Sequence, residues 1–351
     1  MINLFATTIE TLFIHKVGNR SRNEELFISK EPYKVNDELR PILKEFFFKP
    51  FREKADQLFK FSEDSKLREA LSEPEIIRDD LSFIDDKAIS KEITQLLYDC
   101  GNHPHIKSGE VYIAFLKNIQ MEDRSYDGIG IFKSEMKYDF IEFEKKENHL
   151  DVILKQGVNL NKLDKGAIII NDIDAGQRKV LHFDSNKYDT KYWIDNFLGL
   201  EELEDSSFYT KKYLKFCQDF GKDVVLPATD KMEEVAFINK AVNHFAKSDF
   251  FSEDEFLAEM DLGEDLNNEF SHYKTERAGK YQLDGITDFD ISNESVSEAR
   301  KRIKSEISLD TGITIKVAKG TVNSAKYLEK GWDEEKQMYY YLAYFNKEDK
   351  N

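Results

Sequence analysis

The strongest constraint on the fold is a hydrophobic period of two between Gly109 and Ser185. Stretches in this region alternate or are continuously apolar, as β-strands are, and short polar turns separate them. They are GEVYIAFLKNI, YDGIGIFKSEM, YDFIEFEKK, HLDVILKQG and GAIIINDIDAGQRKVLHFDS, the last with a turn at 174–176 between two strands. Because strands with such short connections pair with their neighbours, the sequence predicts an antiparallel β-meander.

Helical patterns flank the predicted sheet on both sides. A strand over 7–18 and helices over 35–51 and 87–101 precede it. Gly101 is the last residue of the second helix, at a position where a left-handed residue often ends a helix. Beyond the sheet we expect helices over 206–220 and 296–307. Asp230 and Ser252 stand at expected N-cap positions of further helices.

A chain of 351 residues is long enough to form two hydrophobic cores. The segment GKDVVLPATD, residues 221–230, interrupts the helical pattern and is the expected boundary. We therefore predict an α+β fold with two domains. Residues 1–222 form an antiparallel sheet flanked by helices, and residues 223–351 form a mostly helical domain that ends in a β-hairpin within 324–345.

The formal net charge of −17 limits which partners the chain can bind. Duplex DNA is bound through Lys and Arg side chains that neutralise phosphates, so an acidic chain needs its basic residues segregated. Residues 1–60 and 271–330 each hold 11 Lys and Arg against 9 Asp and Glu. Residues 249–269 hold nine acidic and no basic residues, which indicates a solvated helix face or a docking surface for a basic partner.

Cysteine usage and hydropathy indicate a cytoplasmic protein. Cys100 and Cys217 are too few for the disulfide framework of a small secreted protein. The N-terminal segment lacks a basic region followed by an apolar core, and no run approaches the roughly 18 apolar residues of a membrane span. We expect a soluble protein with no membrane partner.

The segment CGNHPHIKSGE places Cys100, His103 and His105 close together, and these residue types bind zinc. However, Cys100 lies on the apolar stripe of the helix over 87–101, where a free cysteine acts as a small apolar residue. The other histidines are solitary in the sequence. We therefore interpret the segment as a helix-to-strand junction and expect no metal and no cofactor.

Asp127, Glu135 and Lys137 are similar to the Asp…Glu-x-Lys pattern of metal-dependent nucleases, in which two carboxylates hold a divalent ion. In a strand, at about 3.3 Å per residue, the two carboxylates would lie far apart. The sequence also lacks a phosphate-binding loop, a dinucleotide fingerprint and a nucleophile elbow. We therefore predict a protein that is not an enzyme, and keep the nuclease as an alternative.

Two clusters of basic residues are candidates for contact with DNA phosphates, although ordinary solvated surfaces carry similar clusters. They are Lys16, Arg20 and Arg22 near the first turn, and Arg300, Lys301, Arg302 and Lys304 on a predicted helix.

Six blocks of the sequence, taken together and in order, resemble the bacterial nucleoid-associated proteins of the NdpA type. They are IHKVGNRSRNEELFISKEP, NHPHIKSGEVYIAFLKNI, DGIGIFKSE, NLNKLDKGAIII, the segment from YWIDNFLGL to SSFYTKKYLKFCQDF, and YLEKGWDEEKQMYYYLAYF. The resemblance implies a cytoplasmic protein that associates with the folded bacterial chromosome, without an established catalytic activity or cofactor. It assigns no DNA-contacting residues.

The leading hypothesis is a non-enzymatic, acidic nucleoid-associated protein with a role in chromosome organisation. It would bind double-stranded DNA directly through its basic clusters, dock on a DNA-bound or DNA-processing protein, or do both. The alternatives are the metal-dependent nuclease and a pure protein-interaction module. A homo-oligomer is compatible with each of them.

Overall fold

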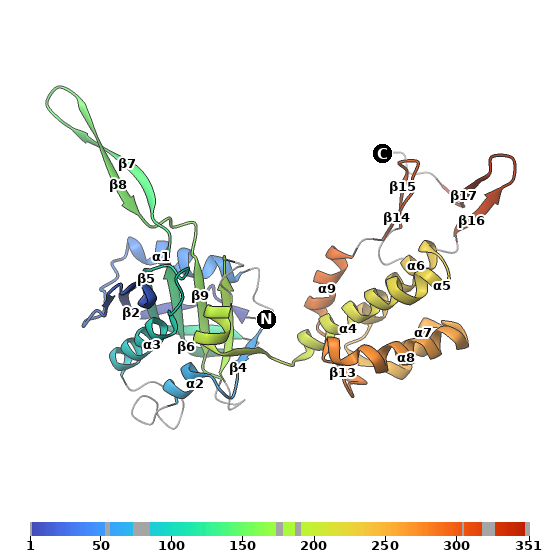
Figure 1. The fold of residues 1–351 in the computed structure, drawn as a ribbon, viewed down its shortest axis with the longest axis horizontal. Coiled ribbons are helices and arrows are strands. Elements are labelled where there is room, and N and C mark those ends of the chain that lie inside the picture. Colours follow the sequence, from blue (N-terminus) through green and yellow to red (C-terminus); the bar gives the residue numbers. More distant parts are fainter. Residues whose placement is uncertain are drawn as a thin grey trace. The chain divides into compact units, whose positions relative to one another are not determined.

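The structure is a computed structural model that describes residues 2–52, 57–72, 85–121, 123–172, 178–186, 191–303, 305–317 and 327–347 (Figure 1). The expected turn at 174–176 and the candidate Lys304 lie outside these residues. The chain divides into two compact units, Met1–Leu203 and Glu204–Asn351.

This division lies N-terminal to the boundary expected at 222/223. The difference concerns α4 (Ser206–Phe220), which follows the sheet directly in the sequence. Its buried aromatic residues, among them Tyr213 and Phe216, belong to the hydrophobic core of the second unit. The packing of α4 therefore places it with the helices that follow it.

In the first unit, nine strands of the described residues form one sheet. They are β1 (Ile2–Asn3), β2 (Thr8–Val17), β3 (Leu26–Phe27), β4 (Phe59–Phe61), β5 (Gly109–Met121), β6 (Arg124–Ser134), β9 (Lys165–Ile170), β10 (Lys179–Asp184) and β11 (Leu200–Glu202). Their order is β11-β4-β10-β9-β6-β5-β2-β3, with β1 on β5, and the strand pairs are antiparallel.

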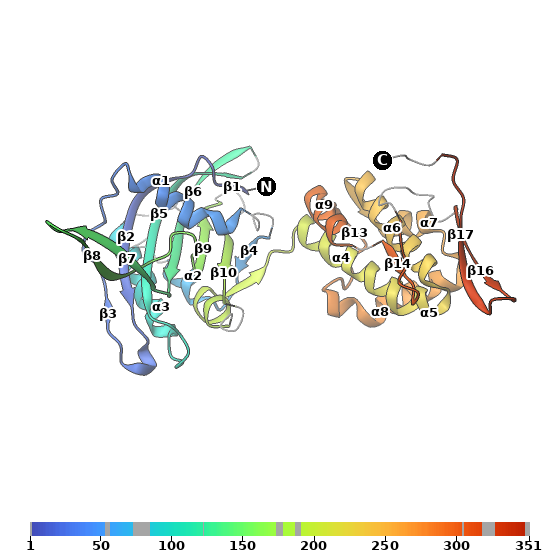
Figure 2. The same ribbon diagram turned by 90° about the horizontal axis from the view of Figure 1, so that it is seen from above.

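The antiparallel sheet predicted from the sequence is thus confirmed, but two of the predicted strands leave it. β7 (Tyr138–Lys145) and β8 (Leu150–Gly157) pair with each other as a separate hairpin, and β6 pairs directly with β9. Figures 1 and 2 show this hairpin standing off the sheet between the ends of β6 and β9. The β7–β8 hairpin is therefore an insertion between two neighbouring strands of the meander.

Helices cover both faces of the sheet. α2 (Lys66–Ala70), α3 (Asp86–Cys100) and the π-helical η3 (Lys191–Leu198) contribute to one core, and α1 (Leu39–Phe48) with the short η2 (Lys49–Phe51) contributes to the other. Successive residues of β9 alternate between them, with Ile169 in the first core and Ile168 in the second. The unbroken apolar run of β9 follows from burial on both faces.

Gly101 and Gly128 have different roles in the first unit. Gly101 ends α3 with φ −75°, so the left-handed conformation expected there is wrong; its N–H instead donates to the Tyr98 carbonyl in a tight final turn. Gly128 lies so close to β9 that an added Cβ would stand 2.3 Å from the Ile169 carbonyl oxygen. Close packing of strands therefore requires this glycine.

The second unit is mostly helical, as expected. Its helical elements are α4, the π-helical η4 (Gly221–Val225), α5 (Leu226–Ala228), α6 (Lys231–Lys247), α7 (Glu253–Met260), α8 (Gly263–Tyr281) and α9 (Asn293–Arg302). Its strand pairs are β12 (Phe250–Ser252) with β13 (Asp288–Asp290), β14 (Glu306–Ser308) with β15 (Thr314–Lys316), and β16 (Leu328–Asp333) with β17 (Met338–Ala343). The last pair is the predicted C-terminal hairpin.

Side-chain capping accounts for some of the helix boundaries in this unit. Asp230 accepts hydrogen bonds from the N–H groups of Met232 and Glu233 and caps α6 as predicted. Ser252 precedes α7 but makes no side-chain cap, because it is paired in β12. α9 ends at Arg302 rather than at 307, since the chain turns into β14 there.

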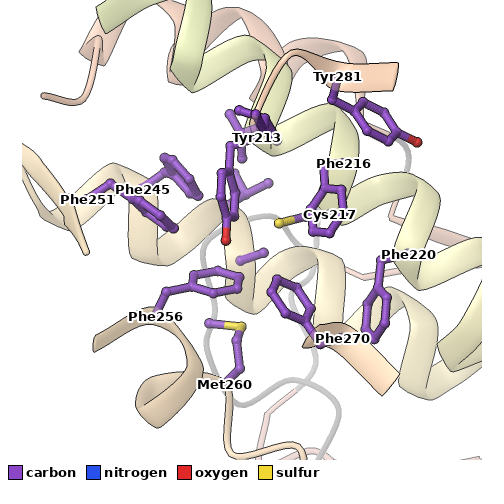
Figure 3. Close-up of a cluster of buried hydrophobic side chains, with 14 of the residues drawn as sticks. Tyr213, Phe216, Cys217, Phe220, Phe245, Phe251, Phe256, Met260, Phe270 and Tyr281 are labelled. Atoms are coloured by element: carbon purple, nitrogen blue, oxygen red, sulfur yellow. The ribbon is translucent and has the colours of Figure 1, made fainter. Parts of the chain in front are cut away.

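Aromatic side chains dominate the core of the second unit (Figure 3). Tyr213 lies at its centre, with its ring centroid 4.3 Å from that of Phe251. Phe251 also stacks on Phe245 at 5.0 Å. The Tyr213 hydroxyl donates to Glu253 at 2.9 Å, so the polar end of this buried side chain is satisfied.

A buried histidine joins the sheet to α3 in the first unit. The His15 side chain is 2% exposed; its Nδ1 accepts from the Ser29 N–H at 3.1 Å, and its Nε2 lies 2.7 Å from the Ser90 hydroxyl. Since Nδ1 is an acceptor, the proton lies on Nε2 and the ring is neutral. Burial lowers the pKa of His15 from 6.5 to about 4.

We predict that His15 makes the first unit less stable in acid. As pH falls from about 6.5 to about 4, His15 takes up a proton in the unfolded chain but not in the folded one, which costs about 3 kcal/mol. His15→Gln, which does not titrate, should remove this part of the pH dependence whatever its stability at pH 7. Denaturant unfolding at several pH values measures it, with the exposed His149→Gln as the control. Parallel pH profiles for wild type and His15→Gln would contradict the assignment.

Candidate nucleic-acid interface

The first cluster of predicted DNA-binding residues lies at the end of β2 and on the short helix η1 (Arg20–Arg22). Lys16 is exposed on β2. Arg20 forms an ion pair with Asp99 at 3.2 Å, and the two side chains are about half exposed (52% and 46%). Arg22 pairs with Glu24 at 2.8 Å and donates to the Pro104 carbonyl at 3.0 Å. Both arginines therefore hold neighbouring segments of the protein.

The turn that carries Arg20 and Arg22 also holds the His-Pro-His segment, residues 103–105, in place. Asn19 is fully buried and donates through its side-chain amide to the carbonyls of His103 and Ile106, at 2.9 and 2.6 Å. It thereby fixes the link between α3 and β5. Cys100 is half-buried, and its thiol contacts the Asn196 carbonyl at 3.2 Å. Among the described residues, no group of three or more His, Cys, Asp or Glu is arranged to hold a metal ion.

The second predicted cluster lies in the last turn of α9. Arg300 donates to the Asn243 side chain at 2.9 Å and so ties α9 to α6. Arg302 pairs with Glu298 one turn earlier at 3.5 Å, while Lys301 is exposed. Basic side chains at this end also interact favourably with the helix dipole. The cluster thus contributes to the fold and presents Lys301 and Arg302 to solvent.

The structure does not bring the nuclease-like residues together. Asp127 lies near the start of β6 and pairs with Lys117 at 2.5 Å, whereas Glu135 follows the far end of the same strand. Eight residues of extended chain span about 26 Å. Lys137 pairs with Glu110 at 2.5 Å. The three side chains are held at separate places by separate ion pairs.

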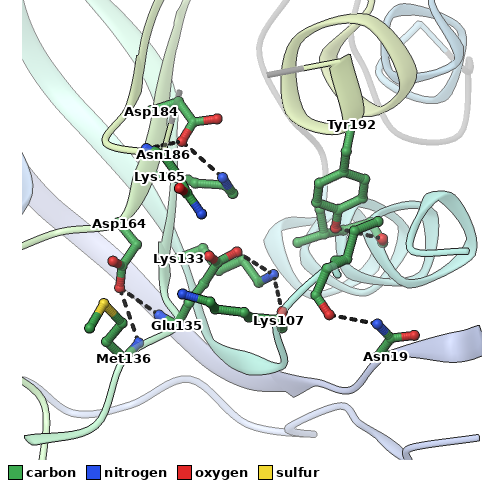
Figure 4. A network of polar contacts seen from close by, with 12 residues as sticks. Asn19, Lys107, Lys133, Glu135, Met136, Asp164, Lys165, Asp184, Asn186 and Tyr192 are labelled. Carbon is green, nitrogen blue, oxygen red and sulfur yellow. Dashed lines mark hydrogen bonds and ion pairs between the residues drawn. The ribbon is translucent and has the colours of Figure 1, made fainter. Parts of the chain in front are cut away.

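Glu135 belongs to a buried polar network at the end of the sheet (Figure 4). Its carboxylate accepts from Lys133 at 2.8 Å, and the two side chains are 3% and 0% exposed. Lys133 also donates to the Lys107 carbonyl at 2.7 Å. Burial lowers the pKa of Lys133, and the Glu135 carboxylate opposes that shift.

A second ion pair lies beside the first, because Lys133 and Lys165 are partners across β6 and β9. Lys165 pairs with Asp184 of β10 at 2.8 Å, and Asp184 also accepts from the Asn186 N–H. Asp164 accepts the backbone N–H groups of Glu135 and Met136 at 2.7 and 3.2 Å. The network compensates two buried lysines where the sheet ends, and we assign it a structural role.

A further basic surface joins two helices of the second unit that are distant in the sequence. Lys212 and Lys215 lie on α4, and Arg277 and Lys280 lie on α8. We call these four residues the α4–α8 ridge. The spacing of Lys212 and Lys215, i and i+3, places them on one helix face.

Two aspartates hold the ridge together. Asp219 pairs with Lys215 at 2.6 Å and with Lys280 at 3.7 Å, and it accepts from the Tyr281 hydroxyl at 2.7 Å. Asp223 pairs with Arg277 at 3.3 Å and accepts from Tyr273 at 2.8 Å.

Lys212 completes the link between the helices by donating to Gln282 at 3.0 Å. Lys215 and Lys280 remain well exposed, each at 59%. This surface was not predicted from the sequence. Its only signal was the Lys-Lys-x-x-Lys spacing in YTKKYLKF; pairing with α8 is a long-range contact.

The fold and these surfaces define a two-unit α+β protein whose candidate sites are clusters of basic side chains. Among the described helices, none is long and apolar enough to cross a membrane. The chain belongs to the family described as nucleoid-associated protein YejK, whose family model matches residues 13–339. A comparison with curated proteins gave no match. The resemblance to nucleoid-associated proteins predicted from the sequence blocks is thus confirmed.

We predict that Lys133→Met destabilises the first unit by on the order of 3 kcal/mol, because Glu135 is left buried without its cation. Adding Glu135→Gln should recover part of the loss by removing that charge. Urea unfolding provides the measurement. Lys155→Met is the control, since Lys155 and Glu142 form an exposed pair for which we expect a loss below about 1 kcal/mol. An equal loss in the single and double variants would contradict the role of the charge.

Proposed function

We propose that the protein associates with the bacterial nucleoid as a non-enzymatic DNA-binding protein, and that the α4–α8 ridge is its main contact with phosphates. The observation that supports the ridge most directly is the convergence of three cationic side chains, Lys215, Arg277 and Lys280, around the carboxylates of Asp219 and Asp223. Lys212 lies on the same face of α4 and donates to Gln282. Positive charge is thereby concentrated locally in a chain of net charge −17.

The length of the ridge suits a duplex. From Lys212 to Asp223, α4 and the helical turn that follows it extend about 16 Å, roughly five base pairs at 3.4 Å each. Lysines at this spacing can reach several phosphates without reading base edges, so the proposal is binding with little sequence preference. Lys16, Arg20 and Arg22, together with Arg300, Lys301, Arg302 and Lys304, remain secondary candidates for the same contact.

We predict that replacing Lys212, Lys215, Arg277 and Lys280 by Gln weakens duplex DNA binding and flattens its salt dependence. Each phosphate contact adds about 0.9 to the slope of log affinity against log salt, so the slope should fall by about 2 to 4. Binding of a fluorescent duplex across a salt series gives both quantities. A variant with four other exposed lysines replaced by Gln, Lys30, Lys34, Lys66 and Lys91, is matched in charge and should bind nearly as wild type. Equal losses in the two variants would leave net charge as the cause and reject the ridge.

A second candidate function is docking on a DNA-bound protein through the acidic segment of α7 and α8. Glu253 and Glu259 are engaged inside the unit, with Lys274 and His244 respectively. The other acidic residues of the segment 249–269 that lie on these helices are exposed; they are Asp254, Glu255, Glu264, Asp265 and Glu269. Acidic residues in the first turn also stabilise a helix, so this surface has a structural reading as well.

We predict that a basic partner docked on this surface stays bound after nuclease treatment of a lysate. Replacing the five exposed acidic residues by Gln or Asn should then abolish its recovery while DNA binding by the ridge persists. Affinity purification with and without nuclease provides the measurement. Partners that disappear after nuclease treatment would instead be bridged by DNA.

A further inference from the structure

The β7–β8 hairpin has one face whose middle is apolar and whose ends are polar. Cross-strand register places Ile141 opposite Leu154 and Phe143 opposite Val152, and Leu150 follows opposite Lys145. Because alternate residues of a strand point to the same side, these five apolar side chains form one continuous patch. We call it the hairpin face.

The hairpin face is open to solvent in the described part of the chain. Its five apolar side chains are between 55% (Val152) and 67% (Leu154) exposed. The hairpin forms its own two-stranded sheet, apart from the nine-stranded one. A two-stranded hairpin alone is marginally stable in water, and a contiguous apolar patch of this kind marks an interaction site.

The opposite face of the same hairpin differs. It carries Glu142 paired with Lys155, together with Glu144 and Asp151. Phe140 lies on this side but leans over Gly157, where an added Cβ would stand 3.0 Å from its ring. The opposite face thus carries these four charged side chains beside Tyr138, Phe140 and Ile153, whereas the hairpin face presents its five apolar side chains as one exposed patch.

Charge at the two ends of the hairpin face identifies the partner. Asp139 lies at the base of this face and Lys145 at the tip, six residues apart, or about 20 Å along the strand. A two-fold axis perpendicular to the strands would place the Lys145 of one copy against the Asp139 of the other, twice. The face is thus complementary to itself, as an isologous interface requires.

Other arrangements fit less well. A two-fold axis along the strands would bring the two Lys145 ammonium groups together. Pairing along the strand edges would leave the apolar side chains in water. The face has one cation along its length, at the tip, so DNA phosphates have little to bind there.

We propose that the hairpin face is a homodimer interface, in which two copies pack face to face and tip to base. The four strands form a small two-layer sandwich with sheets about 10 Å apart. The hairpin face has five apolar side chains, fewer than the roughly 20–30 residues that each partner contributes to a standard interface. The dimer is therefore weak, with a dissociation constant on the order of 10 µM.

Sedimentation of the full chain across a range of concentrations tests the proposal. Wild type should shift from monomer to dimer with rising concentration, and Phe143→Asp and Leu154→Asp should each raise the dissociation constant at least tenfold. Phe140→Asp on the opposite face is the matched control and should leave it within about twofold. A wild-type chain that stays monomeric at 100 µM, or equal effects of Phe140→Asp and Phe143→Asp, would overturn the interface.

Charge exchange tests the orientation without relying on the apolar residues. Asp139→Lys and Lys145→Asp should each weaken the dimer, and the two together should restore it, because both contacts are then re-formed with opposite signs. Carbodiimide cross-linking of mixed light and heavy isotope-labelled protein should yield a Lys145–Asp139 link between copies. A double exchange that dimerises no better than the single variants, or a link between copies at other residues alone, would overturn the tip-to-base arrangement.

Discussion

The first unit depends on the burial of its central strands on both faces. Residues of β5, β6 and β9 alternate between two hydrophobic cores, so helices must cover both sides of the sheet. The constraint is strict where these strands end. Lys133 and Lys165 emerge side by side from β6 and β9 and stay buried because Glu135 and Asp184 neutralise them. A carboxylate that neutralises a buried lysine is not available to a metal ion. The Glu135-x-Lys137 pattern therefore does not form the metal site of a nuclease.

Basic residues that are adjacent in the sequence often hold other segments of the fold in place. Arg22 holds the Pro104 carbonyl, and Arg300 holds Asn243 on another helix. The α4–α8 ridge instead joins basic residues that are about 60 positions apart in the sequence. Lys215 and Lys280 share Asp219 as a partner, and Arg277 pairs with Asp223. A cluster of basic residues seen in the sequence therefore indicates side chains that hold the fold together as readily as a binding surface.

The elements with strong periodicity were predictable, and their partners were not. The stripe of Ile89, Ile93 and Leu97 correctly predicted α3, and the alternation in 138–157 correctly predicted two strands. Nothing in that alternation told the core of the sheet from the outward face of the hairpin, because an exposed Phe143 and a buried Phe132 follow the same period. The division before α4 was missed for a related reason, since α4 is amphipathic and the sequence does not specify which core receives its apolar stripe.

A weak contact with DNA and a weak contact between two copies can act together in one protein. At physiological salt the field of a surface charge falls off over about 8 Å, so the proposed ridge would attract phosphates at short range while the net charge of −17 would oppose nonspecific binding. A single ridge of four cations would thus bind DNA weakly and with strong salt dependence. Two copies joined through the hairpin face would carry two ridges, and the second contact would then form at a raised effective concentration. Dimerisation and DNA binding would reinforce each other, so an acidic chain would be retained on DNA where several copies gather.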